Sequence, residues 1–166
     1  DVVVVDFDVE PIEGTRAPSS ESLMHVAIYE ARPDVGAVIH THGIFTSVAA
    51  VAGLRIPPII DEMVVTIGGV IEVAEYAFPG SEELARNVQD ALKDRNAVIL
   101  SNHGAVGVGR DLGEALEVSR LTERVAQIFI YASLLGDVST LPEDVVAAET
   151  AIFAMRGSGA ARKLTR

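Results

Sequence analysis

The sequence predicts a layered α/β domain, and three observations support this prediction. Short runs rich in valine and isoleucine, typical of buried strands, alternate with longer segments whose apolar residues recur at helical spacing. Apolar residues make up 49% of the chain, enough to fill a sizeable core. The length of 166 residues is that of one domain, and neither an internal repeat nor a second core is evident.

In the first half of the chain, valine runs and turn residues separate the expected elements. Valines dominate residues 1–9, as in a strand buried on both faces, and residues 11–17 have the composition of a loop. Ser19 or Ser20 can cap a helix that runs to about Arg32. The other elements expected here are a strand at 37–42, a helix at 43–53, and loops with short strands at 56–76, where β-branched residues surround two glycines.

In the second half the signals for helices are stronger. Ser81 is a plausible cap for a helix from residue 80 to about 93, and the acids that follow it suit the positive end of the helix dipole. Strands are expected at 97–100 and 105–108, a long amphipathic helix at 112–135, and a final helix after Pro142. Residues 156–166 are small and basic, so we expect a domain over residues 1–155 followed by a flexible basic tail.

The charge balance limits the classes of partner. The chain has 24 acidic and 13 basic residues, a net charge of −11, which argues against nucleic acid and anionic membrane as partners. It has no cysteine, so disulfides and thiolate metal sites are excluded, and a reducing, cytoplasmic location fits. No apolar run approaches the 18 or so residues of a membrane span. The chain starts without methionine, so we expect that a natural N-terminal segment is missing from it.

Histidines are the most informative residues of the chain. His40 and His42 are two of only four histidines and lie two residues apart, so that on a strand both imidazoles project to the same face. His103 lies in the predicted turn before Gly104, whose lack of a side chain gives room for close approach. Two interpretations stay open: a histidine metal site, or hydrogen-bonded histidines at a strand end. Glu21 likewise either complements a helix dipole or takes part in a site with Ser19 and Ser20.

Taken together, these motifs resemble the class II aldolase/adducin family. The segments that carry the resemblance keep the family's order and similar spacing, and they are Ser19-Ser20-Glu21, His40-Thr41-His42 and His103-Gly104. The resemblance implies a three-layer α/β/α sandwich around a mixed, mainly antiparallel sheet. It also implies Zn²⁺, or another divalent metal such as Mn²⁺ or Co²⁺, held by His40, His42 and His103, with Glu21 as a further ligand or as the acid/base group.

The activity that this resemblance implies is aldol cleavage. A ketose 1-phosphate such as L-fuculose 1-phosphate would be split into dihydroxyacetone phosphate and an aldehyde through a metal-stabilised enediolate. Ser19 and Ser20 match the family's phosphate-binding pair, and the family's site is completed across subunits, so we expect a homo-oligomer, with a tetramer favoured.

One departure from the family leaves the reaction open. Where the fuculose phosphate enzymes use a tyrosine from a neighbouring subunit as a proton donor, this chain offers Asp61-Glu62. Asp61 is either a catalytic acid/base, as in related epimerases, or a solvent-facing loop residue. The competing hypotheses are another metal-dependent reaction of the family, namely sugar-phosphate 4-epimerisation, dehydration or decarboxylation, and a non-catalytic interaction module like the adducin head. The adducin module lacks the metal histidines, so the histidines favour an enzyme.

Overall fold

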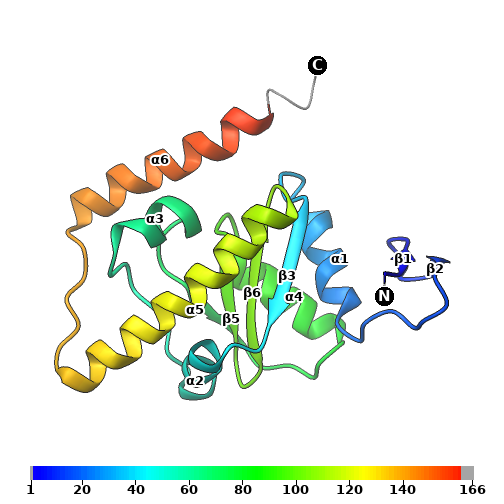
Figure 1. Ribbon diagram of the computed structural model, residues 1–166, viewed down its shortest axis with the longest axis horizontal. Helices are drawn as coiled ribbons and strands as arrows, with labels where there is room; N and C mark the ends of the chain where they lie inside the picture. Colours follow the sequence, from blue (N-terminus) through cyan, green and yellow to red (C-terminus); the bar gives the residue numbers. More distant parts are fainter. Residues whose placement is uncertain (1, 162–166) are drawn as a thin grey trace.

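A four-stranded sheet forms the middle layer of the computed structural model, which describes residues 2–161 (Figure 1). The two antiparallel pairings are β3 with β6 and β6 with β5, whereas β4 pairs with β5 in parallel. The expected mixed, mainly antiparallel sheet is therefore confirmed. The strands are β3 (Ala37–Thr41), β6 (Gly104–Gly109), β5 (Ala97–Leu100) and β4 (Glu72–Ala74), in their order across the sheet.

Helices cover both faces of this sheet and give the predicted three layers (Figure 1). On one face, α1 (Ser22–Ala31) and α4 (Glu82–Leu92) bury Met24, Ile28 and Val88 against the strands. On the other face lie α2 (Ile44–Ala52), α3 (Asp61–Ile67) and α5 (Leu112–Leu135), and α6 (Glu143–Ala161) packs over α3. Among the described residues, no helix combines the length and the apolarity that a bilayer crossing requires.

Most of the predicted elements are confirmed with small shifts of their ends. The strands of residues 97–100 and 105–108 correspond to β5 and β6, and the long helix corresponds to α5. Ser81 caps α4 as expected, because its hydroxyl oxygen accepts a hydrogen bond from the backbone N–H of Leu84 at 3.1 Å.

The predicted buried strand at residues 1–9 is wrong. Within residues 2–9 only the two-residue β1 (Val4–Val5) forms, and it pairs with the three-residue β2 (Pro11–Glu13) in a separate two-stranded sheet in which Val4 is exposed. The carboxylate of Asp6 accepts hydrogen bonds from the backbone N–H groups of Asp8 and Glu10, at 3.0 and 2.9 Å. This turn ends the strand, since an aspartate side chain competes with strand pairing for the backbone donors that follow it.

The prediction of loops and short strands at residues 61–76 is wrong in its first part, because residues 61–67 form α3. Its β-branched residues favour a strand locally, but Met63, Val64 and Ile67 recur at helical spacing and are fully buried against the sheet. The helix ends at Gly68, which has a φ of 99°, a conformation that suits glycine. β4 then follows at residues 72–74.

The ends of two helices also differ from expectation. α1 starts at Ser22, so Glu21 is its N-cap residue and neither Ser19 nor Ser20 caps it; the Ser19 hydroxyl instead accepts a hydrogen bond from the N–H of Glu21 at 3.2 Å. α6 continues to Ala161, so the predicted basic tail begins inside a helix, and residues 162–166 lie outside the described part of the chain.

Arg32 joins the end of α1 to the segment that leads into β5. Its guanidinium donates two hydrogen bonds to the carboxylate of Asp34, at 2.7 and 2.6 Å, and two more to the carbonyl oxygens of Lys93 and Arg95, at 2.8 and 2.9 Å. The hydrogen bonds from Arg32 hold the pKa of the Asp34 carboxyl below its ordinary value of 3.8. Ionised Asp34 therefore stabilises the fold by orienting this guanidinium.

We expect Asp34→Asn to destabilise the protein at neutral pH by up to about 1 kcal/mol, the upper range for pairs exposed to solvent. Since the folded-state pKa of Asp34 is depressed, the contribution is fully present above pH 3.8 and is lost as the pH falls through the folded-state pKa. Urea unfolding of wild type and variant between pH 7 and pH 3 measures this, with Asp90→Asn on the exposed side of α4 as the control. A stability difference that does not change with pH would contradict the assignment.

Candidate metal centre

Three histidines converge where β3 ends and β5 turns into β6. His40, His42 and His103 each offer a ring nitrogen, and these nitrogens all lie within 4.8 Å of one another. The centroid of the His40 ring is 4.8 Å from those of both other rings, and the centroids of His42 and His103 are 5.0 Å apart. Within residues 2–161 these three form the one group of histidines and carboxylates with spacing suited to a metal ion.

The pairing of β3 with β6 explains why the three rings meet. Thr41 lies opposite Ala105 in this antiparallel pairing, so the next residues along the two chains, His42 and Gly104, also lie close to each other. A Cβ on Gly104 would lie 2.8 Å from Cδ2 of His42 and even closer to the carbonyl oxygen of Thr41. Position 104 therefore has to be glycine, as the sequence suggested, and His103 directly before it comes within reach of the other two histidines.

The turn that carries His103 is held on both sides. The N–H of His103 donates to the carbonyl oxygen of Leu100 at 3.1 Å, and the N–H of Asn102 donates to the carbonyl oxygen of Ala50 in α2 at 3.2 Å. Asn102 has a φ of 55°, in the left-handed region that asparagine tolerates better than most residues. The tight Asn-His-Gly sequence thus places the third imidazole on a fixed support.

His40 is oriented for binding a cation through Nε2. Its Nδ1 lies 3.1 Å from the carbonyl oxygen of Ala105, and because a carbonyl can only accept, Nδ1 carries the proton. The unprotonated Nε2 then faces Nε2 of His42, 2.9 Å away, which serves as the donor in this hydrogen bond. A histidine ligand held through its second nitrogen by a backbone carbonyl is the usual arrangement in metal sites.

The environment of His40 keeps its ring neutral. Burial lowers the pKa of His40 to about 4; the hydrogen bond to Ala105 opposes this shift, and the neighbouring His103, His42 and His25 add to it. A neutral imidazole at pH 7 has a lone pair available for a metal.

Glu21 lies at the start of α1 and is buried, with 9% of its surface exposed. Among residues 2–161 its Oε2 has no hydrogen-bond partner, a costly state for a buried carboxylate unless a ligand or cation satisfies it. Its charge acts on the histidines through His25. Burial lowers the pKa of His25, and the Glu21 carboxylate opposes this shift. His25 in turn contributes to lowering the pKa of His40.

The remaining predicted residues lie in different surroundings. Ser19 and Ser20 are exposed just before α1, on the same segment as Glu21. Asp61 is exposed at the start of α3. Desolvation raises the pKa of Glu149 in α6, and the nearby Asp61 carboxylate raises it further. Within one chain Asp61 thus faces α6, whereas His42 precedes α2 (Figure 1).

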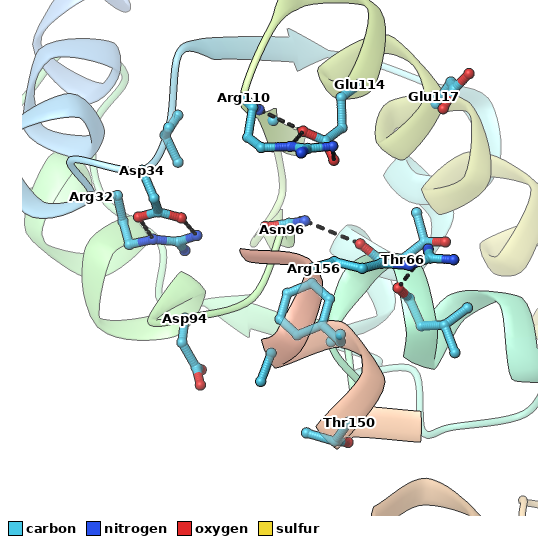
Figure 2. A pocket seen from close by; sticks show the side chains of 16 residues that line it. Arg32, Asp34, Thr66, Asp94, Asn96, Arg110, Glu114, Glu117, Thr150 and Arg156 are labelled. Atoms are coloured by element: carbon cyan, nitrogen blue, oxygen red, sulfur yellow. Dashed lines mark hydrogen bonds and ion pairs between the residues drawn. The ribbon is translucent and has the colours of Figure 1, made fainter. Parts of the chain in front are cut away.

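A large pocket lies at the other end of the sheet. It has a volume of about 660 Å³ and is lined by residues that precede β3 and β5 and that follow β6 (Figure 2). The arginines in it are already paired: Arg32 with Asp34, and Arg110 with Glu114 at 2.9 Å. The histidines lie at the opposite ends of these strands, so this pocket is not part of their site.

Sequence reasoning missed Glu123, which lies in the middle of α5. Its carboxylate accepts hydrogen bonds from the first turn of α2, directly after His42. The available signal was indirect: α2 is preceded by glycine, which has no side chain to cap a helix, so that an acceptor from elsewhere was needed.

Comparison with known proteins assigns this arrangement to a family. A family model, described as the class II aldolase and adducin N-terminal domain, matches residues 1–130. The chain belongs to this family. Class II aldolases depend on a metal, and the three clustered imidazoles of His40, His42 and His103 fit a divalent cation.

Relatives and solved structures agree with the assignment. The chain is 35% identical over 144 residues to 5-deoxy-D-ribulose 1-phosphate aldolase of Bacillus thuringiensis, covering 87% of this chain and 67% of that protein. It is 33% identical over 147 residues to L-fuculose phosphate aldolase of Escherichia coli, covering 88% and 68%. A solved L-fuculose 1-phosphate aldolase has a TM-score of 0.87 at 34% identity, covering 92% of this chain and 71% of that one. The chain thus spans about two thirds of these curated relatives.

We expect divalent metal to stabilise the wild-type protein by about 2.7 kcal/mol at a free metal concentration of 100 times Kd, through binding to the native state alone. The double variant His40→Ala/His42→Ala should lose this effect, because two of the three ring nitrogens are gone. Thermal unfolding with and without Zn²⁺ measures the shift. His25→Gln, which removes the one histidine outside the triad, is the control and should retain most of it; equal shifts in all three proteins would contradict the site.

Proposed function

We propose that this chain is the catalytic domain of a zinc-dependent aldolase that cleaves a small ketose 1-phosphate into dihydroxyacetone phosphate and an aldehyde. The observation that carries the proposal is the convergence of His40, His42 and His103; it is supported by the buried Oε2 of Glu21, which has no hydrogen-bond partner among residues 2–161. Membership of the family and relatives named as aldolases of fuculose and deoxyribulose phosphates support the reaction class.

Zinc is the metal that suits the donors best. Three imidazoles leave one tetrahedral position for substrate, the arrangement of catalytic zinc sites, although Mn²⁺ or Co²⁺ could also occupy such a set. When bound, zinc would supply a Lewis acid that polarises the carbonyl of the substrate. His40, His42 and His103 would hold it, with Glu21 as a further ligand until substrate arrives.

Glu21 has the properties of the group that moves the proton. No donor in the described part of the chain engages its Oε2, so it can accept a proton from a substrate hydroxyl or carbon and return it later. Its backbone is fixed, since its N–H donates to Ser19 Oγ and its carbonyl accepts from Met24 N–H at 3.1 Å. A fixed backbone keeps the carboxylate in reach of the same atoms through the cycle.

Ser19 and Ser20 would bind the substrate phosphate. Both are exposed at the start of α1, where the helix dipole favours an anion. The Ser19 hydroxyl accepts from the Glu21 N–H, so its own hydrogen is available for a phosphate oxygen. Binding the phosphate on the segment that carries Glu21 would align the substrate with the base.

Asp61 is proposed as an acid/base group that acts in the site of a neighbouring subunit, because in its own chain it faces α6. The proposal therefore includes a homo-oligomer, a tetramer by resemblance to the family, in the cytoplasm. Exposed apolar side chains at Ile44, Val48 and Val51 along one side of α2, adjacent to the histidines, support contact between subunits.

A second candidate function is epimerisation or decarboxylation on the same scaffold. The observation that favours it is Asp61 in place of the tyrosine of the fuculose phosphate enzymes. A solved Escherichia coli protein entitled YgbL, a putative aldolase/epimerase/decarboxylase, is 28% identical with a TM-score of 0.77. Substrate assays separate these candidates.

The zinc-loaded protein is tested with L-fuculose 1-phosphate and 5-deoxyribulose 1-phosphate for release of dihydroxyacetone phosphate, and with ribulose 5-phosphate for epimerisation. We expect cleavage of at least one ketose 1-phosphate and no turnover after removal of metal. Turnover of ribulose 5-phosphate alone would replace the aldolase by the epimerase, and no turnover of any of the three would refute a sugar-phosphate enzyme.

Glu21→Gln should lower kcat by about 10²- to 10⁴-fold, the usual contribution of general acid–base catalysis, because the amide cannot accept the proton. Bound zinc is measured on the same samples, so that loss of the metal and loss of the base are distinguished. Glu30→Gln, an exposed residue near the end of α1, is the matched control and should retain wild-type kcat. Wild-type kcat in Glu21→Gln would rule out the acid/base role.

Asp61→Asn is tested by subunit complementation. If each site takes Asp61 from a neighbour, mixing Asp61→Asn subunits with Glu21→Gln subunits creates some sites with both wild-type groups, and activity reappears in hybrid oligomers. We expect each variant alone to be nearly inactive and the mixture to regain part of the wild-type rate. Full activity of Asp61→Asn alone, or no recovery on mixing, would contradict the shared site.

A further inference from the structure

The segment from His42 to α2 contains a helix start that cannot cap itself. α2 begins at Ile44, and its N-cap residue is Gly43, which has no side chain to accept a hydrogen bond from the first turn. The free N–H groups of a first helical turn need acceptors, normally from Ser, Thr, Asp or Asn at the N-cap. This start follows His42 directly, so whatever satisfies it also fixes the chain next to a metal-binding ring.

Glu123 of α5 supplies the missing acceptor. Its Oε1 accepts from the N–H of Phe45 at 2.8 Å, and its Oε2 accepts from the N–H and the hydroxyl of Thr46, at 3.0 and 2.9 Å. Both carboxylate oxygens are thus used, on donors that a capping side chain of α2 itself would otherwise satisfy. A negative charge at this end is further favoured by the helix dipole.

Gly43 is required for the carboxylate to come so near. A Cβ at this position would lie 2.6 Å from Cδ of Glu123 and 2.8 Å from Oγ1 of Thr46, and closer still to Oε2 of Glu123. Its backbone is extended, with φ −62° and ψ 149°, so close approach and not an unusual conformation explains the glycine. The residue next to His42 is therefore shaped by Glu123.

Glu123 itself is held rigidly. The residues around it in α5, Thr122 and Val125, are buried with 1% and 0% of their surface exposed, and α5 packs on β3 and β6, the strands that position the histidines. A side chain on this helix has a fixed relation to the sheet. It can hold α2 and the residue before it at a set distance from β3.

We propose that Glu123 is a positioning residue of the metal centre: by capping α2 from α5 it fixes the backbone of Gly43 and thereby the place of His42 in the triad. The inference rests on the proposed metal-dependent function. Both oxygens of Glu123 are engaged by the first turn of α2, so its effect on the metal centre passes through His42.

The test compares Glu123→Ala with Asp111→Ala, a matched cap removal on the same helix. Asp111 caps α5 through its Oδ1, which accepts from Glu114 N–H at 2.9 Å, at the end of the sheet away from the histidines. Zinc affinity is measured by competition with a chromophoric chelator, with urea unfolding of the metal-free proteins alongside. We expect Glu123→Ala to weaken zinc binding about 10- to 100-fold, as for other residues that orient metal ligands, and Asp111→Ala to leave it unchanged.

Two milder variants keep the test decisive if Glu123→Ala does not fold. Glu123→Gln retains one acceptor oxygen and Thr46→Val removes one donor, so each should weaken zinc binding by less than Glu123→Ala and by more than Asp111→Ala. Their Co²⁺-loaded forms should also show altered visible absorption, which reports the geometry of the ligands, whereas Asp111→Ala should keep the wild-type spectrum. If Glu123 only stabilised the fold, its variants would lower the free energy of unfolding and leave the zinc affinity and the Co²⁺ spectrum unchanged.

Wild-type zinc affinity and Co²⁺ spectrum in the Glu123 variants would overturn the inference, and so would equal losses in Glu123→Ala and Asp111→Ala. This failure is distinct from failure of the proposed function. If the wild-type protein binds zinc and cleaves a ketose phosphate while the Glu123 variants bind zinc normally, only the positioning role is lost. If the wild-type protein binds no divalent cation, the proposed function itself fails.

Discussion

The register between β3 and β6 is the constraint on which the rest of the site depends. It sets Thr41 opposite Ala105, so that His40 can donate from Nδ1 to the carbonyl of Ala105 and present Nε2 to the other imidazoles. A shift of one residue would turn His40 and His42 to the other face of the sheet. The buried valines of β6 and the close approach at Gly104 both resist such a shift, so the packing of the core and the geometry of the metal centre are fixed by the same pairing.

The candidate site of this strongly acidic chain consists mainly of imidazole rings. Burial keeps His40 uncharged at pH 7, and the one buried carboxylate near the histidines, Glu21, has a free oxygen. Two other acids have partners within the protein: Glu123 contacts the start of α2, and Glu62 pairs with Arg124. Oε2 of Glu21 differs from them, because it has no hydrogen-bond partner among the described residues.

Local patterns explain what the sequence could predict. The spacing of His40 and His42, the Asn-His-Gly turn and the cap of α4 are each contained in a few neighbouring residues, and all lie where the local rules put them. The start of α3 was missed because its β-branched residues favour a strand, while burial against the sheet, which no short window reveals, selects the helix. Glu123 was missed because its partners lie 77 and 78 positions away in the sequence.

The use of a distant cap in place of a local one has a physical consequence. A serine or aspartate at position 43 would satisfy α2 alone and leave its angle to α5 to apolar packing, which tolerates small shifts. A carboxylate on α5 satisfies the same donors only when α2 lies at one distance and one orientation, because hydrogen bonds are directional. Gly43 cannot cap α2 with a side chain of its own. Because Glu123 of α5 binds the start of α2 instead, His42 before Gly43 is connected to the helix that packs on β3. The loss of a local cap affects only position 43. His42 is held by the pairing of β3 on one side and by the start of α2, bound to Glu123, on the other.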